Sequence, residues 1–394
     1  MSILQKKKYH PRFICIIISC CFLSAHATGI NILSTGALPD GKTVNSIAIQ
    51  KAIDSCAATG GGKVIVPTGV FVTGSLQLHS GIELHLQSGA VLMGSRSMAD
   101  YPLGSLLVAK GCTDVQLTGT GSINGSGDAF YDQNFQPLQR PLPFLLFDSC
   151  RFLRIRDVKV VNSPSHVFRM LNCSEVVIDG IYLNNPERSP NTDGIDLVDS
   201  RHVYISNSTL ITGDDAICLK SHFGKVENIT VTNCTIQSDD AAIKCGTGSK
   251  DTIQHCVFSN IVIRNTRYGL ALFMQEGGVY RYLSFNNISI QTGGRNKNHY
   301  PVFVDVDRKR AGERLGRIEN ISFSNLQIET SGNILIAGQP SAPLKNISLH
   351  NISMRVRDCH DLSKQKKPRG NKNTPVFADT KDLANVNAHV VIAY

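Results

Sequence analysis

A nine-residue pattern that recurs from residue 152 onward constrains the fold more than any other feature of the sequence. Eight copies, at steps of 23, 27, 26, 27, 27, 38 and 26 residues, begin at Phe152, Glu175, His202, Asn228, His255, Tyr282, Asn320 and Asn346. Each copy ends in an apolar residue and has a turn-forming residue at its sixth position, namely Asp157, Gly180, Asn207, Asn233, Asn260, Asn287, Asn325 and Asn351. A period in the mid-twenties that is built from short alternating strands is typical of a solenoid.

A parallel β-helix explains this period better than a leucine-rich repeat does. Leucine-rich repeats need Leu at fixed places and a helical side, and the sequence shows neither. In a parallel β-helix each coil supplies two or three short strands, and equivalent positions stack about 4.8 Å apart. A sixth-position residue at a tight bend would need a positive φ, which Gly, Asn and Asp tolerate, and stacked Asn amides can bond along the column. We therefore expect an all-β fold, a parallel β-helix (solenoid).

A short helix is expected to cap the N-terminal end of this solenoid. A strand around 30–33 comes first, and Asn45 can then cap a helix that ends at Gly60-Gly61-Gly62. Its apolar face consists of Ile49, Ala52, Ile53 and Cys56. Short strands follow at Val64–Val66, Val70–Val72, Leu76–Leu78, Ile82–Leu86 and Ala90–Leu92. Residues 28–394 are interpreted as a single catalytic β-helix domain, because no second domain is apparent.

Residues 1–27 have the features of a signal peptide. A positive segment ends at Arg12, an apolar run extends from Phe13 to Leu23, and Ala25-His26-Ala27 is a small-x-small cleavage site. The apolar run is short for a membrane span. An uncleaved anchor and lipoprotein processing at Cys20 are the alternatives. We expect a secreted or periplasmic protein without a membrane span.

Charge and cysteine usage constrain the function less. Removal of residues 1–27 takes away four positive charges and lowers the formal net charge from +9 to +5, which suits an acidic polymer. Nine of the 12 cysteines remain, with no zinc-like spacing, and we interpret them as small core residues rather than a disulfide framework. The 38-residue step predicts an insertion at about Gly293 to Arg317, where a loop could shape a binding face. The basic run Lys364 to Lys372 is interpreted as a solvated loop, so we expect no nucleic-acid partner. We also expect a monomer.

Two acidic segments carry the candidate chemistry. Asp193 in Asn191-Thr192-Asp193 precedes Gly213-Asp214-Asp215 by about one coil, because it lies 21 residues before Asp214 and 22 before Asp215. A solenoid would bring the three carboxylates together on neighbouring rungs, although their repulsion costs stability. Glycosidic hydrolysis needs such a group, in which one carboxyl group protonates the leaving oxygen and another activates water. Aspartates on exposed turns and a calcium site are the alternatives.

These motifs resemble family 28 of the glycoside hydrolases, the polygalacturonase family. The resemblance extends from Gly60-Gly61-Gly62 through the repeat to about Met354. It implies a right-handed parallel β-helix and inverting hydrolysis of an acidic plant cell-wall polysaccharide, with no cofactor and no metal. By motif, Asp214 would be the general acid, and Asp193 with Asp215 would hold the water. Inversion asks for about 6.5–9.5 Å between the acid and base carboxyl groups.

Two motifs of that family are missing. Alignment of the rungs places the family's Gly-His-Gly histidine at Ala241, and the Arg and Lys of its Arg-Ile-Lys at Ala271 and Phe273. Lys244 falls in the column of the missing Arg and Lys220 in that of the missing Lys. Both should point outward, because Ile217, Leu219, Ile243 and Cys245 alternate inward.

We therefore expect Lys220 and Lys244 to bind a substrate carboxylate from shifted positions. Asn191 and His222 are further candidate substrate contacts. Other residues that could be sugar or surface contacts, without an assigned role, are His166, His202, His255, Arg267 and Tyr300.

Three functions remain open on these residues. The first is a polygalacturonase-like hydrolase, with rhamnogalacturonan or chain ends as variant substrates. The second is a calcium-dependent polysaccharide lyase on the same fold. The third is a non-catalytic carbohydrate-binding β-helix that retains the aspartates.

Overall fold

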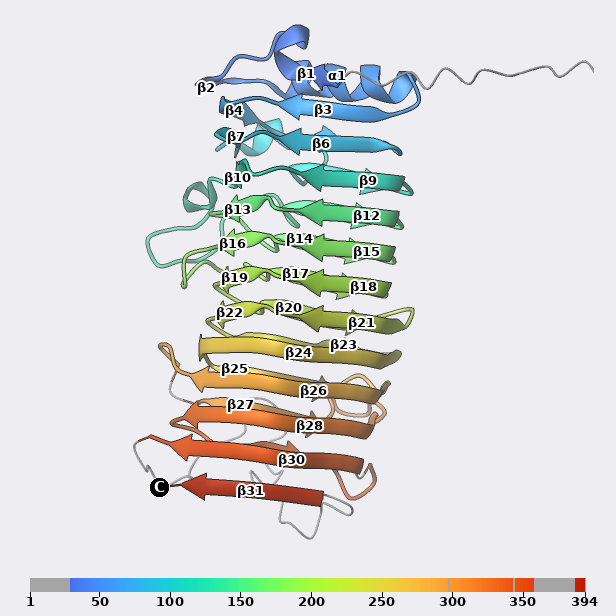
Figure 1. Ribbon diagram of the computed structural model, residues 1–394, viewed down its shortest axis with the longest axis vertical. Coiled ribbons are helices and arrows are strands. Elements are labelled where there is room, and N and C mark those ends of the chain that lie inside the picture. Colours follow the sequence, from blue (N-terminus) through green and yellow to red (C-terminus); the bar gives the residue numbers. More distant parts are fainter. Residues whose placement is uncertain (1–28, 297, 343, 358–386, 394) are drawn as a thin grey trace, which may run out of the picture.

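The computed structural model describes residues 29–296, 298–342, 344–357 and 387–393, the last range by its backbone. The predicted leader, Cys359 and the basic run at 364–372 lie outside these residues. The chain forms a right-handed parallel β-helix, as expected, whose strands stack from α1 (Ser46–Ala58) at one end to β31 (Asn387–Ala393) at the other (Figure 1). Within the described ranges, no helix combines the length and apolar character needed to cross a membrane.

One parallel sheet of 10 strands lies next to all the predicted catalytic residues. Its strands are β5 (Leu76–Gln77), β8 (Leu107–Lys110), β11 (Leu145–Asp148), β14 (Phe168–Leu171), β17 (Ile195–Val198), β20 (Ile217–Ser221), β23 (Ala241–Ser249), β25 (Tyr268–Met274), β27 (Tyr300–Val306) and β29 (Leu335–Ala337). Ile195 pairs with Ile217, and Ile217 pairs with Ile243. The sheet therefore repeats at the coil period that the sequence predicted.

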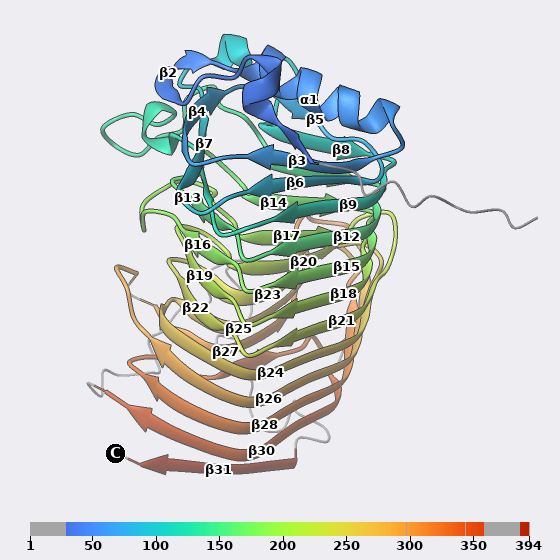
Figure 2. The ribbon, with the colours of Figure 1, turned by 45° about the horizontal axis from the view of Figure 1, so that its top comes forward.

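A second sheet of 21 strands begins as two rows. One row contains β1 (Ile30–Asn31), β3 (Gly62–Val66), β6 (Ile82–Leu86), β9 (Thr113–Thr118), β12 (Arg151–Arg156), β15 (Ser174–Asp179), β18 (Arg201–Ser206) and β21 (Val226–Thr232). The other contains β2 (Asp40–Val44), β4 (Gly69–Thr73), β7 (Ala90–Gly94), β10 (Ser122–Asn124), β13 (Lys159–Val161), β16 (Tyr182–Asn184), β19 (Thr209–Thr212) and β22 (Thr235–Ser238). The rows merge at β24 (Thr252–Thr266), which pairs with both β21 and β22, and continue as β26 (Val279–Thr292), β28 (Arg317–Thr330) and β30 (Lys345–Val356) (Figures 1 and 2).

The N-terminal end is covered by α1, as predicted (Figure 2). The helix buries the four residues of its predicted apolar face, Ile49, Ala52, Ile53 and Cys56. The helix begins after Asn45, as predicted, but the side chain of Asn45 does not cap it, because Asn45 Oδ1 accepts a hydrogen bond from the Leu38 N–H (2.7 Å) instead. The strand predicted at 30–33 is also shorter than expected, since η1 (Ile32–Thr35) replaces its second half. The other 3-10 helices are η2 (Met98–Asp100) and η3 (Gly127–Ala129).

The sixth-position residues of the repeat adopt the left-handed conformation predicted for them, with φ between 53° and 67°. Their amides also bond along the column: Asn287 Nδ2 donates to Asn260 Oδ1 (2.7 Å), and Asn351 Nδ2 to Asn325 Oδ1 (2.7 Å). The first position of every copy has a positive φ as well, between 51° and 58°. Sequence alone did not predict this second column, because residues such as Phe152 and Tyr282 rarely adopt that conformation.

The insertion predicted at Gly293 to Arg317 is not one loop. Strand β27 lies inside it and pairs with β25, so the extra residues divide between segments 293–299 and 307–316. A step length counts residues, but it does not reveal where the next rung resumes.

The core of the solenoid is apolar and stacked. The rings of Phe258, Phe285 and Phe323 lie 4.8 Å and 5.0 Å apart on successive rungs. The eight cysteines in the described residues are free and buried, and all of them except Cys218 pack in the core, which confirms the interpretation for those seven.

Candidate active site

Neighbouring rungs of the ten-stranded sheet bring the three predicted aspartates together. Asp193 precedes β17, and Asp214 and Asp215 precede β20. The register of these strands places Asp193 beside Asp215, and the Gly194 N–H donates to the Asp215 carbonyl (2.8 Å). The carboxylates therefore gather on the outer face of the sheet, at the N-terminal ends of its strands.

Asp214 lies at the bend before β20. Its carbonyl accepts hydrogen bonds from Thr212 Oγ1 (2.5 Å) and Ser238 Oγ (2.8 Å), and its Oδ1 accepts one from the Asp215 N–H (2.9 Å). Burial raises the pKa of Asp214 well above its usual range, and the charges of the neighbouring aspartates, chiefly Asp215, raise it further. A carboxyl group in this environment keeps its proton and can act as an acid.

Asp215 faces a buried lysine. Lys244 Nζ lies 2.6 Å from Asp215 Oδ2 and 3.7 Å from Asp240 Oδ2, and the side chains of Asp215 and Lys244 are only 5% and 7% exposed. Burial alone would lower the pKa of Lys244, but the negative charges around it, chiefly Asp215, and the hydrogen bond to Asp215 together outweigh burial and raise this pKa well above its usual value. Lys244 therefore remains an ammonium ion and neutralises Asp215.

Asp193 faces a lysine in the same way. Lys220 Nζ lies 3.2 Å from Asp193 Oδ2 and 2.7 Å from Asp196 Oδ1. Burial alone would raise the pKa of Asp196, but the Lys220 ammonium and His166 hold it well below its usual range. Lys220 and Lys244 thus leave the sheet on its outer face, as predicted, and each reaches an aspartate of the site.

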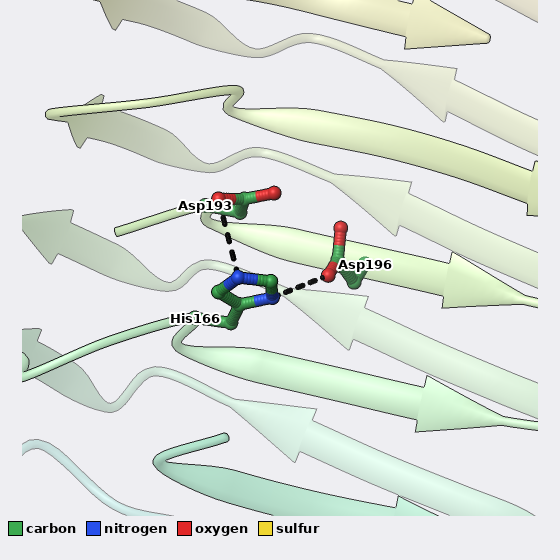
Figure 3. Close-up of side chains that lie close together, drawn as sticks. All are labelled: His166, Asp193 and Asp196. Atoms are coloured by element: carbon green, nitrogen blue, oxygen red, sulfur yellow. Dashed lines mark hydrogen bonds and ion pairs between the residues drawn. The ribbon is translucent and has the colours of Figure 1, made fainter. Parts of the chain in front are cut away.

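A histidine without an assigned role in the sequence lies beside Asp193. His166 precedes β14; its Nδ1 is 2.9 Å from Asp196 Oδ2, and its Nε2 is 3.8 Å from Asp193 Oδ1 (Figure 3). Arg169 Nη1 lies 3.4 Å from the same Asp196 oxygen. No motif marked these residues. The one available signal was distance along the chain, since residues 166 and 193 are 27 positions, or one coil, apart.

The two remaining predicted contacts differ in position. Asn191 Nδ2 lies 3.5 Å from Asp214 Oδ2, and its Oδ1 accepts a hydrogen bond from Arg140 Nη2 (2.9 Å), a residue that the sequence did not single out. His222 follows the far end of β20, where its N–H donates to Asp199 Oδ1 (2.7 Å). In the described part of the chain, no hydrogen bond or ion pair joins the His222 side chain to the three aspartates.

The next rung extends the acidic cluster. Asp240 Oδ1 lies 3.1 Å from Arg267 Nη1, and Asp239 Oδ2 accepts a hydrogen bond from Arg295 Nε (2.6 Å). Arg295 belongs to segment 293–299, so this part of the predicted insertion does border the cluster. Of the described aspartates in this part of the sheet, only Asp214 has no ion pair; the others are Asp193, Asp196, Asp215, Asp239 and Asp240.

An apolar cluster occupies the rungs where the family resemblance would place His, Arg and Lys. It consists of Ala241, Tyr268, Ala271, Phe273, Tyr300, Phe303 and Leu335. Lys244 pairs in register with Ala271, as the rung alignment predicted, and its Nζ lies 5.4 Å from the centre of the Phe273 ring. Tyr300 is 1% exposed and presents almost no surface to a sugar.

Two groups of side chains are close enough to hold a metal ion. The ligand atoms of His166, Asp193 and Asp196 lie within 4.8 Å of one another, as do those of Asp214, Asp215 and Asp240. A lysine ammonium already contacts a carboxylate of each group: Lys220 in the first group and Lys244 in the second. Calcium also needs six to eight oxygen ligands. The residues fit lysine-neutralised carboxylates better than a calcium site, which disfavours the lyase alternative.

The chain resembles known polygalacturonases in sequence and in fold. The family model for glycosyl hydrolases family 28 matches residues 56–367. A probable polygalacturonase from Vitis vinifera is 25% identical over 383 residues, which cover 85% of this chain and 76% of the relative. The probable polygalacturonase At3g15720 from Arabidopsis thaliana is 28% identical over 342 residues, covering 82% and 72%. A hyperthermoactive exopolygalacturonase from Thermotoga maritima shares the fold, with a TM-score of 0.72, 21% identity and coverage of 84% and 87%.

Proposed function

The chain belongs to family 28 of the glycosyl hydrolases, and on this premise we propose that it hydrolyses glycosidic bonds of a pectic polysaccharide. Its relatives named above are polygalacturonases, which supports a substrate of that class. Membership of this family makes the protein a glycosidase. The substrate and the role of each residue are what we propose from the site.

The contrast between Asp214 and its neighbours carries the proposal. Asp214 has a raised pKa, whereas Asp193 and Asp215 each face a lysine ammonium. When the environments of two carboxyl groups differ in this way, one group can act as the acid and the other as the base. In the proposed reaction Asp214 protonates the leaving glycosidic oxygen, and Asp193 with Asp215 takes a proton from the attacking water.

Stereochemistry provides a direct test of this assignment. One oxygen atom each of Asp214 and Asp215 lies within 4.8 Å of the other, but this is not the separation of the two carboxyl groups, which is roughly 5 Å in retaining enzymes and 6.5–9.5 Å in inverting ones. Inversion therefore rests on the family resemblance rather than on this distance. Proton NMR of the first product should show the inverted anomer. A retained anomer would refute the inverting mechanism and make one of the two lysine-paired aspartates the nucleophile.

We propose that Lys220, Lys244, Asn191 and His222 contact the substrate, with the lysines also serving as counter-ions of the aspartates. Lys220 is the more accessible lysine, since its side chain is 15% exposed against 7% for Lys244. Replacement of each residue by Ala should raise KM on a uronic substrate. An unchanged KM for a variant removes that residue from the binding site.

The apolar cluster bears on which pectic polymer is cut. A uronate carboxylate bound at the rungs of Ala271 and Phe273 would meet no cation on those side chains. We therefore propose that the enzyme does not recognise a carboxylate at that position. The substrate would then be rhamnogalacturonan, or the enzyme would cleave from a chain end. Reducing-end assays on polygalacturonan and rhamnogalacturonan, combined with viscometry, separate these cases. An unsaturated product that absorbs in the near ultraviolet would instead support the lyase, and binding without turnover would support a non-catalytic β-helix.

A secreted or periplasmic location and a monomeric state complete the proposal. Residues 1–27 are proposed as the cleaved leader. N-terminal sequencing of the exported protein should begin at residue 28, and size-exclusion chromatography with light scattering should give the monomer mass.

A further inference from the structure

His166 stands in one column with the aspartates of the site. Phe168 pairs with Ile195, Ile195 with Ile217, and Ile217 with Ile243, so residues 166, 193, 215 and 241 occupy equivalent positions on four successive rungs. The Val167 N–H donates to the Asp193 carbonyl (2.8 Å), which fixes the first step of this column. Position 241 is where the family resemblance places an imidazole, and it holds Ala241. The column thus carries its imidazole on the rung before the two aspartates instead of the rung after them.

We propose that His166 is a positioning residue of the hydrolytic site that orients Asp193 through its Nε2 atom, an inference that rests on the function proposed above. Asp196 is fully buried and accepts from Lys220 Nζ (2.7 Å), so its own position is fixed. It holds the imidazole at Nδ1 (2.9 Å), which directs Nε2 toward Asp193 Oδ1 (Figure 3).

The chemistry of the pair determines which atom donates. An ionised carboxylate has only acceptor sites, so a favourable contact requires a proton on His166 Nε2. This holds for an imidazolium that donates from both nitrogens.

His166 and Lys220 then approach different oxygens of Asp193. Lys220 binds Oδ2 (3.2 Å) and His166 approaches Oδ1. Each carboxylate oxygen has two lone pairs, so both can still accept a hydrogen bond from water. A base held in this way needs little reorganisation when it takes the proton.

Two substitutions at residue 166 distinguish the roles of the two ring nitrogens. The amide of Asn can take the place of Nδ1 and that of Gln the place of Nε2, so His166→Asn keeps the contact with Asp196 and His166→Gln keeps the donor toward Asp193. We expect His166→Asn to lower kcat roughly 10- to 100-fold, the effect typical of outer hydrogen-bond partners, with KM little changed. His166→Gln should retain most of kcat. The acid limb of the kcat profile of His166→Asn should also move to higher pH, because ionised Asp193 loses a donor while Lys220, Arg169 and Asp196 remain.

A matched control is available on the outside of the solenoid. His202 Nδ1 lies 2.9 Å from Glu175 Oε1 on the preceding rung, and His202→Asn should leave kcat and its pH profile unchanged. The position of the acid limb does not depend on the folded fraction, so it remains informative for a less stable variant. Wild-type kcat and profile in His166→Asn, or equal losses in both His166 variants, would overturn the inference while leaving the proposed function intact. Absence of hydrolysis by the wild-type protein on every pectic substrate would overturn both.

Discussion

Removal of the Lys244 charge should destabilise the protein severely, because it leaves a buried carboxylate without its counter-ion. Lys244 Nζ lies 2.6 Å from Asp215 Oδ2, and Asp215 is 3% exposed. In the described part of the chain, Asp215 Oδ1 accepts no hydrogen bond, and the remaining donor near Oδ2 is the Cys218 thiol at 3.8 Å. A thiol is a weak donor and does not replace an ammonium group.

Breaking a buried ion pair by removing one partner costs about 3–5 kcal/mol. We expect Lys244→Met to lose this amount of unfolding free energy at pH 8. The loss should shrink as the pH falls toward 5, because protonation of Asp215 in the folded variant relieves the unpaired charge. The double variant Asp215→Asn/Lys244→Met, which buries no isolated charge at this pair, should regain most of the stability.

Urea unfolding measures these differences, and an exposed pair provides the control. Lys63 Nζ lies 3.1 Å from Glu83 Oε1 with side chains 41% and 22% exposed, so Lys63→Met should cost less than about 1 kcal/mol. The reasoning fails if Lys244→Met costs less than about 1 kcal/mol at pH 8. It also fails if the double variant is no more stable than Lys244→Met.

Three further predictions concern the proposed acid Asp214, its neighbour Asp240 and the column of turn residues. Asp214→Asn should reduce kcat by a factor of about 10² to 10⁴ while leaving substrate binding largely intact, as measured by kinetics and calorimetry; comparable turnover would exclude Asp214 as the acid. Asp240→Asn removes a negative charge that raises the pKa of Asp214, so the basic limb of kcat/KM, which requires protonated Asp214, should move to lower pH; an unmoved limb would contradict this coupling. Asn287→Ala should lower the unfolding free energy by roughly 1–3 kcal/mol, since it loses the 2.7 Å bond to Asn260 and leaves Ala at a φ of 55°, and Asn287→Gly should lose less of it; equal losses in urea would refute the conformational part.

The sequence predicted best the features that repeat with the coil. The asparagines at the sixth position of the repeats, from Asn207 to Asn351, predicted a bend with positive φ on each rung, because Asn tolerates that conformation better than most other non-glycine residues. The separation of Asp193 from Asp214 matched the period, so their proximity followed from counting alone. Their roles as acid and base stay predictions for the kinetic experiments above.

Features that depend on one particular neighbour were not predictable in the same way. Asn45 satisfies backbone groups near Leu38 instead of capping α1, and nothing in its local sequence distinguishes the two outcomes. Lys220 and Lys244 were correctly expected to point outward, but their pairing with aspartates depends on side-chain length and burial. His166 belongs to no motif, and its contact with Asp196 spans 30 residues of chain.

The column that contains residues 166, 193, 215 and 241 makes the site unequally tolerant of changes in chain length. One extra residue within a strand of these rungs would turn the following side chains to the opposite face, because the side-chain period of a strand is two. A whole additional coil far from the column would leave its four members adjacent. The same coil placed between β17 and β20 would move Asp193 away from Asp215 by about 4.8 Å and separate the two aspartates that we propose to hold the water. Natural gain or loss of coils is therefore compatible with the proposed catalysis where it occurs at the two ends of the solenoid, but not where it occurs between these rungs.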